Sequence, residues 1–173
     1  MGNGTKQDGI LLYGINSAGK STLMKSIGLN IVLAQIGYYV ASTSFTYSPY
    51  ESLFTRICGN DNMFRGLSSF MVEMMELKYI LKHADKYSLV CIDELVASTE
   101  RFSGVALVAS TIHELYSRQS SMFMATHLHE LAQMPEITKI PTLGIYHLEV
   151  HYDERSKTLV YDRKLREGPG TGL

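Results

Sequence analysis

The chain is poor in cysteine and lacks any long hydrophobic run. Its only two cysteines, Cys58 and Cys91, stand in unrelated contexts without metal-ligand spacing. Two such thiols provide no disulfide framework, which predicts a reducing, intracellular compartment. No apolar run approaches the roughly 20 residues that a membrane-spanning helix needs, and residues 1–8 are polar without a secretion-signal pattern. We therefore expect an intracellular protein without membrane contacts, with cytoplasmic, nuclear, mitochondrial and viral origins all open.

An excess of charge of either sign is also lacking. The 16 lysines and arginines are balanced by 17 aspartates and glutamates, which gives a formal net charge of −1. A domain that binds nucleic acid by itself usually carries a basic surface. If this protein acts on DNA, most of the contact must therefore lie outside these 173 residues. The length fits one domain, and 45% hydrophobic with 19% charged residues is typical of a globular protein.

Strand-like and helix-like segments alternate along the chain, without repeats or low-complexity stretches. Short apolar runs bounded by polar residues predict strands, and apolar residues at helical spacing predict helices. We expect strands at 10–13, 88–92 and 121–125, short strands within 38–57, a hairpin of 146–152 with 158–165, and helices at about 21–36, 68–83 and 103–116. This order predicts an α/β fold with a largely parallel central sheet and flanking helices. Residues 1–9 form a lead-in, and 10–173 form the domain.

The clearest motif is the glycine loop at residues 14–21, which reads Gly-Ile-Asn-Ser-Ala-Gly-Lys-Ser between an expected strand and an expected helix. Gly14 and Gly19 let the backbone approach a phosphate closely, and the loop amides can form an anion nest. Lys20 would reach the β- and γ-phosphates, and the Ser21 hydroxyl would bind Mg²⁺. The motif predicts a nucleoside-triphosphate site with loop contacts from Gly14, Ile15, Asn16, Ser17, Ala18, Gly19, Lys20, Ser21 and Thr22.

Two carboxylates, Asp93 and Glu94, follow the apolar segment 89–92. Asp93 at the strand end can orient Mg²⁺ and its water shell, and Glu94 can polarise the attacking water. Because they lie downstream of a phosphate loop, we interpret them as hydrolytic residues and not as a solvated strand terminus. His127 follows the next strand, and the carboxyl ends of parallel strands converge on the ligand crevice. It is therefore a candidate contact for the γ-phosphate, with a structural hydrogen bond as the alternative.

The methionines of the segment 68–83 are most simply core residues. Met71, Met74 and Met75 can fill irregular gaps because their side chains are flexible, and Glu73 with Glu76 is expected on the solvated face of this helix.

Several short runs extend the pattern beyond the phosphate loop. They are Gly37-Tyr38-Tyr39-Val40, Phe54-Thr55-Arg56-Ile57, Ser69-Phe70-Met71-Val72-Glu73-Met74, Tyr87-Ser88-Leu89-Val90, Asp93-Glu94 and Ala125-Thr126-His127. With them, residues 11–170 resemble the ATPase domain of the MutS DNA mismatch-repair family, its domain V. The Phe-Met-Val-Glu-Met run is the most specific of them, because other phosphate-loop families do not share it. The runs Asn60-Asp61-Asn62 and Asp162-Arg163-Lys164-Leu165 look most like a viral and mitochondrial branch.

The resemblance implies an ABC-type ATPase fold that works as a dimer, with ATP and Mg²⁺ at the shared interface. The partner is then a second MutS-like subunit, identical or different, and mismatched double-stranded DNA is bound through regions outside this chain. In this reading ATP binding and hydrolysis are coupled to mismatch recognition. The resemblance assigns roles to Asn16 beside the γ-phosphate, Lys20 and Ser21 on phosphate and Mg²⁺, Asp93 and Glu94 as the Walker B pair, His127 as the switch histidine, Ser68 on the partner's nucleotide and His147 near the adenine.

The sequence departs from the family pattern after the acidic pair. The family has a glycine-containing segment there, whereas this chain reads Leu95-Val96-Ala97-Ser98-Thr99. The mismatch-binding and C-terminal dimerisation regions are expected to lie outside the chain. The alternative function is therefore a nucleotide-dependent dimerisation module with little hydrolysis of its own. A transporter or chromosome-organising ATPase would need a Leu-Ser-Gly-Gly-like signature, which the sequence lacks.

Overall fold

The computed structural model describes residues 7–15, 17–57, 69–96, 100–154 and 157–170. Several sequence-based expectations fall outside these ranges. They concern Asn16, Cys58, the run 60–62, Ser68 and Ser98.

A single six-stranded sheet organises the chain, with the strand order β2-β3-β4-β1-β5-β6. The pairs β2–β3, β3–β4, β4–β1 and β1–β5 are parallel, and the pair β5–β6 is antiparallel. The strands are β1 (Gly9–Tyr13), β2 (Ser52–Arg56), β3 (Ser88–Asp93), β4 (Ser121–Thr126), β5 (Leu143–Asp153) and β6 (Thr158–Glu167). The predicted α/β fold with a largely parallel sheet is confirmed.

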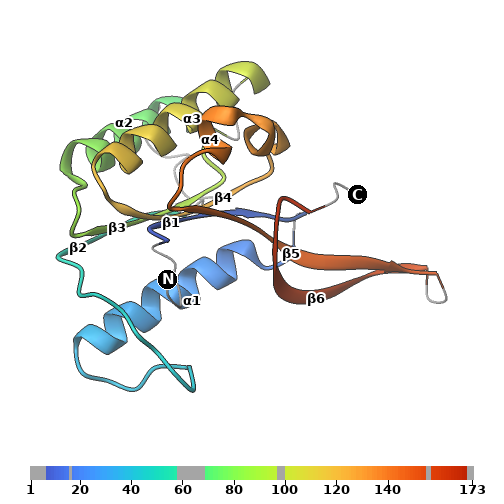
Figure 1. Cartoon of the computed structure of the whole chain (residues 1–173), viewed down its shortest axis with the longest axis horizontal. Helices are drawn as coiled ribbons and strands as arrows, with labels where there is room; N and C mark the ends of the chain where they lie inside the picture. The colour runs from blue at the N-terminus through green and yellow to red at the C-terminus, as the bar shows by residue number, and fades with distance from the viewer. Residues whose placement is uncertain (1–6, 16, 58–68, 97–99, 155–156, 171–173) are drawn as a thin grey trace.

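Helices cover both faces of this sheet (Figure 1). Helices α2 (Ser69–His83), α3 (Arg101–Ser117) and α4 (Pro135–Thr138) lie on one side, and α1 (Lys20–Gln35) lies on the other. The three long helices match the predicted ones within two residues at each described end. The short α4 and a 3-10 turn at His129–Gln133 had no clear signal in the sequence. Every helix in the described part of the chain is too short or too polar to cross a membrane.

The central strands are buried on both faces, as expected for a parallel sheet that is covered on both sides. In β1, Leu11 and Tyr13 belong to the buried hydrophobic cluster on the side of the sheet that α2 and α3 cover. Ile10 and Leu12 belong to the second buried hydrophobic cluster, on the side that α1 covers, which we call the α1-side cluster. Leu11 and Leu12 are fully buried, and each such burial contributes about 1.5–3 kcal/mol. This packing fixes where β1 ends, and therefore where the phosphate loop begins.

The segment before β2 differs from its prediction. The alternating aromatic and polar residues of 38–57 predict short strands, but only Ser52–Arg56 forms one. Side-chain bonds hold the preceding chain in place of sheet pairing, since the Gln35 side-chain amide bonds both the backbone N–H and the carbonyl of Tyr50, at 2.8 and 3.1 Å. Phe45 and Tyr50 pack against the α1-side cluster. The aromatic spacing therefore reflected packing and not a strand.

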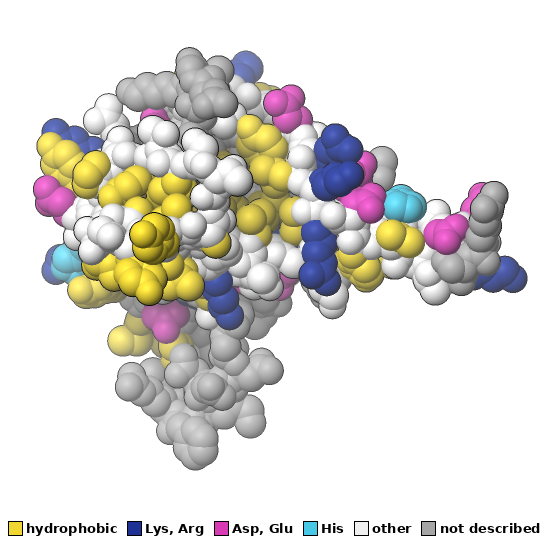
Figure 2. All heavy atoms as spheres, turned by 90° about the horizontal axis from the view of Figure 1, so that it is seen from below, with side chains coloured by type: hydrophobic (Ala, Val, Ile, Leu, Met, Phe, Trp, Pro, Cys, Tyr) yellow, Lys and Arg dark blue, Asp and Glu magenta, His cyan; other side chains and the backbone are white. Residues whose placement is uncertain are grey.

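Apolar side chains remain exposed on α1 and on the segment that follows it. Leu29, Val32, Ile36, Tyr38 and Tyr39 all belong to this group, and Figure 2, seen from the α1 side, shows hydrophobic side chains gathered on this surface.

One expectation about α2 is wrong. Glu73 was expected on the solvated face, but its side chain is buried, with only 3% of the residue exposed. Glu76 is half-exposed, as expected. The burial of Glu73 follows from its ion pair with Arg56 of β2, which compensates the carboxylate for the loss of water.

Candidate functional site

Three chain segments meet where the parallel strands end. Tyr13 of β1 is in register with Thr126 of β4, and Ala125 is in register with Asp93 of β3. The residues that follow these strands are therefore delivered to the same edge of the sheet, as expected for parallel strands. The phosphate loop leaves β1 at this edge, and the acidic pair ends β3 beside it.

The phosphate loop passes directly into helix α1. Gly19 precedes the first helical residue with a φ of +104°, a conformation that favours glycine. A Cβ built at Gly19 would meet no described atom within 4 Å, so a side chain there would stand in open space at the site. Among the described residues, no side chain caps the N-terminus of α1. The amides of its first turn are thus left for an anion.

Lys20 is the best-held charged group of the site. Its side chain is 5% exposed, and its Nζ donates to the carbonyls of Gly14 and Ile15 at 2.6 and 3.4 Å. The same Nζ lies 3.4 Å from a carboxylate oxygen of Glu94. A buried ammonium needs such partners because removal from water is costly. The ammonium is therefore held beside the phosphate loop by the Gly14 and Ile15 carbonyls and the Glu94 carboxylate, and phosphate oxygens could take the place of these acceptors.

Seven of the predicted site residues line one pocket of about 370 Å³, together with one further residue. Its walls are formed by Ser17, Gly19, Lys20, Ser21, Thr22, Asp93, Glu94 and Arg163. The pocket brings together the loop, the hydroxyl of Ser21 and both carboxylates of the acidic pair. Two other loop positions do not line the pocket: Ala18 is buried, and Ile15 packs against the α1-side cluster.

Glu94 adopts a backbone conformation that non-glycine residues rarely take. Its φ is +49°, and Val96 two residues later has a φ of +61°. Left-handed geometry is costly, above all for a β-branched residue such as valine, and it persists only where the surroundings impose it. The Glu94 N–H donates to the Ala125 carbonyl at 3.0 Å. The turn thereby directs the Glu94 side chain toward Lys20 and the pocket.

Two predicted histidines are not brought into this pocket. His127 lies just beyond the end of β4 and is exposed, and it is not among the residues that line the pocket. His147 of β5 is in register with Tyr13, and its Nδ1 lies 3.0 Å from the Gly168 carbonyl. A Cβ at Gly170 would come within 2.9 Å of the His147 ring. His147 therefore packs against the end of the β6 segment.

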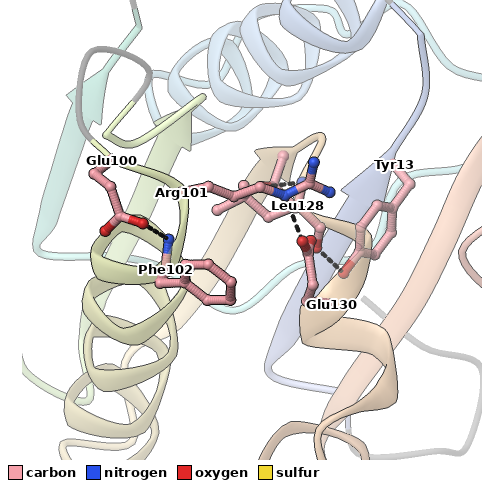
Figure 3. A network of polar contacts seen from close by, with 7 residues as sticks. Tyr13, Glu100, Arg101, Phe102, Leu128 and Glu130 are labelled. Atoms are coloured by element: carbon pink, nitrogen blue, oxygen red, sulfur yellow. Dashed lines mark hydrogen bonds and ion pairs between the residues drawn. The ribbon is translucent and has the colours of Figure 1, made fainter.

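A polar network fixes the turn after β4 (Figure 3). The Tyr13 hydroxyl donates to the Leu128 carbonyl at 3.3 Å, and the Tyr13 ring stacks on His129 with centroids 5.1 Å apart. Burial raises the pKa of the Tyr13 hydroxyl, so it stays a donor. The ion pair between Arg101 and Glu130 lies beside it, and the hydrogen bond from Arg101 lowers the pKa of the Glu130 carboxyl. His129 and Glu130 are thus engaged structurally, and no group of three metal-binding side chains occurs among the described residues.

One pocket residue, Arg163, was missed by the sequence analysis. The β5–β6 pairing changes register between Leu148 and Val150, so that the β6 residues between Tyr161 and Leu165 bulge out of the ladder. Arg163 sits in this bulge with a φ of +54° and lines the phosphate-loop pocket. A bulge can re-aim a side chain toward a neighbouring site. The run 162–165 resembles one branch of the family, but nothing in its residue spacing predicts that the Arg163 side chain reaches the phosphate-loop pocket.

Comparison with known proteins places this architecture in a family. Residues 10–171 match the family model described as MutS domain V. The chain is 47% identical over 173 residues to a putative DNA mismatch repair protein, the mutS homolog L359 of Acanthamoeba polyphaga mimivirus. It is 44% identical over 162 residues to the mitochondrial DNA mismatch repair protein mutS homolog of Sarcophyton glaucum, and 37% identical over 161 residues to the MutS of Streptococcus equi.

The chain covers only a small part of these relatives. The matches include 98%, 94% and 92% of this chain but 15%, 16% and 18% of the three relatives. The comparison also corrects the identification made from the sequence. That identification named the ATPase domain, whereas the matching description names domain V of MutS and does not designate an ATPase domain. On these matches, the chain belongs to the MutS family of DNA mismatch repair proteins, as its domain V.

Proposed function

We propose that this chain binds ATP with Mg²⁺ and hydrolyses it. One observation carries the proposal: a single pocket is lined by the phosphate loop, the Ser21 hydroxyl and the carboxylates of Asp93 and Glu94. Phosphoryl transfer depends mainly on positioning and on electrostatic stabilisation, and these groups supply both.

The residues present fit a nucleoside triphosphate and its metal ion. The uncapped N-terminus of α1, the open space at Gly19 and the Lys20 ammonium suit an anion. Ser21 and Asp93 offer oxygen ligands, and Mg²⁺ is usually held by one or two such groups together with phosphates and water. When bound, Mg²⁺ neutralises phosphate charge and so assists displacement at phosphorus.

The side chains that line the pocket then have separate roles in phosphate binding and in water activation. Lys20 holds the phosphates once it leaves the Glu94 carboxylate, which frees that carboxylate to orient and polarise a water molecule. Arg163 approaches the same pocket from the β6 bulge and adds a second cation. The left-handed turn at Glu94 keeps the carboxylate aimed at the pocket and away from the sheet.

Membership of the MutS family suggests the process in which this activity takes part. We propose that ATP binding and hydrolysis serve DNA mismatch repair, with mismatched DNA bound by regions outside the chain and a second MutS-like subunit completing the site. Asn16 and Ser68, which lie outside the described residues, together with His127 and His147, remain predicted contacts to nucleotide. A location inside the cell likewise remains part of the proposal.

Nucleotide titration tests the core of the proposal. Calorimetric titration of the chain with Mg-ATP is compared between wild type, Lys20→Ala and Lys25→Ala, which removes an exposed lysine from the same helix. We expect Lys20→Ala to weaken binding at least tenfold and Lys25→Ala to leave it unchanged. Equal affinity in all three proteins would contradict the assignment.

A second candidate function is a nucleotide-dependent association module with little turnover of its own. The departure from the family pattern at Leu95-Val96-Ala97-Ser98-Thr99 favours it, because this segment directly follows the acidic pair. The hydrolysis rate measured against protein concentration separates the two functions. A rate that rises with the square of concentration indicates catalysis by a dimer, whereas nucleotide binding without turnover indicates the association module.

A further inference from the structure

The buried carboxylate of Glu73 connects three parts of the fold. One oxygen, Oε1, lies 2.9 Å from Nη2 of Arg56 in β2. The same oxygen accepts the backbone N–H of Val96 at 2.7 Å, in the loop that follows β3. Glu73 itself lies in α2. A buried carboxylate that accepts a backbone N–H at this distance makes a strong, charge-assisted bond.

The loop that receives this bond carries the acidic pair. Glu94 and Val96 both have left-handed backbone conformations, and Leu95 between them is buried. Valine is strongly disfavoured in this conformation, so the surrounding contacts must impose it. Two hydrogen bonds to other elements hold this turn: the Glu94 N–H donates to the Ala125 carbonyl, and the Val96 N–H donates to the Glu73 carboxylate. Without the second bond, the turn that aims Glu94 loses one of its two anchors.

The ion pair alone does not explain the position of Glu73. Arg56 has a second carboxylate within reach, because its Nε lies 3.4 Å from Glu76. Glu73 is thus one of two carboxylates near Arg56, but it also accepts the Val96 N–H, which is a contact separate from the ion pair. Because a single oxygen accepts both donors, an uncharged amide oxygen at the same place could also serve them. The two roles, charge partner and anchor of the loop, can thus be separated by substitution.

We propose that Glu73 is a positioning residue for Glu94, and that it acts by holding the Val96 N–H and with it the left-handed turn beside the pocket. This inference rests on the proposed hydrolytic function. It assigns a role to the Glu73 position of the Phe-Met-Val-Glu-Met run, which the family resemblance left without one.

Four proteins test it: wild type, Glu73→Gln, Glu73→Met and Glu76→Gln. Glu73→Gln keeps an acceptor oxygen, Glu73→Met keeps the length of the side chain without an acceptor, and Glu76→Gln removes the other carboxylate near Arg56 as a control. For each protein we would measure the kcat for ATP hydrolysis, the Kd for Mg-ATP, the midpoint of thermal unfolding and the hydrogen exchange rate of the Val96 amide.

We expect Glu73→Met to lower kcat at least tenfold, to change Kd less than twofold and to speed Val96 exchange at least tenfold. Glu73→Gln should stay within threefold of wild type in kcat, and Glu76→Gln should match wild type in both kcat and exchange. A Glu73→Met protein with wild-type kcat would overturn the proposal. Equal loss in Glu73→Gln and Glu73→Met would also overturn it, because the effect would then follow the charge.

Failure of the proposed function can be told apart from failure of this inference. If the wild-type chain binds no Mg-ATP, the proposed function is wrong, and Val96 exchange then decides the role of Glu73 in holding the loop. Unchanged Val96 exchange in Glu73→Met overturns the inference whatever the hydrolysis rate. If Glu73→Met does not fold, the double variant Arg56→Gln with Glu73→Met removes both charges of the pair and is compared with Arg56→Gln alone in the same measurements.

Discussion

The ammonium of Lys20 lies 3.4 Å from the carboxylate of Glu94, although one residue begins α1 and the other follows β3. The contact joins the group expected to hold phosphate to the group expected to activate water. A triphosphate that enters the pocket competes with Glu94 for the same ammonium. Binding would therefore free the carboxylate at the time when it is needed.

Glu94→Gln should separate binding from turnover. The amide keeps the shape of the side chain but is a poor base, so the Kd for Mg-ATP should change less than threefold, while kcat falls by about 10²-fold or more. Steady-state hydrolysis and calorimetric titration measure the two quantities. Glu136→Gln, at an exposed position of α4, is the matched control. A Glu94→Gln protein with undiminished turnover would remove Glu94 from the proposed mechanism.

Arg163→Ala should weaken Mg-ATP binding. Arg163 lines the pocket, and none of the ion pairs among the described residues includes it, so its guanidinium is available to phosphate. Loss of one charge-assisted hydrogen bond, worth about 1.5–3 kcal/mol, should raise Kd about tenfold or more. Lys164→Ala removes the neighbouring exposed cation, which does not line the pocket, and should leave Kd unchanged. If both variants weaken binding equally, the effect comes from the general charge of the hairpin.

Gly19→Ala should damage the site through the backbone. At a φ of +104° an alanine is strained, by about 1–3 kcal/mol, and its methyl group would project into the space expected for phosphate. We expect a lower midpoint in urea denaturation and Mg-ATP binding at least tenfold weaker. Gly28→Ala is the control, because Gly28 lies inside α1 with open space for a Cβ. It should stabilise the fold by about 0.5–1 kcal/mol and keep nucleotide affinity.

Glu100 should make the stability of the chain depend on acid pH. Its carboxylate accepts the N–H groups of Ser103 and Phe102 at the start of α3, and these bonds lower its pKa below the ordinary value of 4.5. Stability from this cap is present at neutral pH and is lost as pH falls from the ordinary value through the lowered pKa of the folded state. Glu100→Ala should therefore be less stable than wild type at neutral pH, and the difference should shrink in acid.

Urea denaturation at a series of pH values measures this difference. Glu51→Ala, at an exposed acid that caps no helix, provides the reference. A difference between wild type and Glu100→Ala that is equally large at neutral and strongly acid pH would contradict the capping role.

The regular part of the fold and the core of the site were predictable because local signals agree there. An apolar run, a glycine loop and a helix follow one another directly, so the place of Lys20 and Ser21 could be expected from the sequence alone. Asp93 and Glu94 were predictable for the same reason, since they end a buried strand beside that loop.

Other features depend on contacts between distant segments and gave no local signal. The side chain of Glu73 is buried only because Arg56 and the Val96 N–H meet it from two other elements. Arg163 reaches the pocket through a register change in the hairpin. His127 follows β4 at the edge where the parallel strands end, but it is not among the residues that line the pocket, and its contact with the γ-phosphate stays a prediction.

The position of β1 in the sheet has a consequence for the order of folding. Among the strands that the structure describes, β1 comes first, yet its partners there are β4 and β5, at registers such as Gly9 with Met122 and Gly9 with Leu143. Pairing across such long sequence separations is slow, because a large loop must close before any contact forms. During synthesis the first strand must therefore wait for the second half of the chain. The phosphate loop that it carries would become able to bind nucleotide only in the last steps of folding.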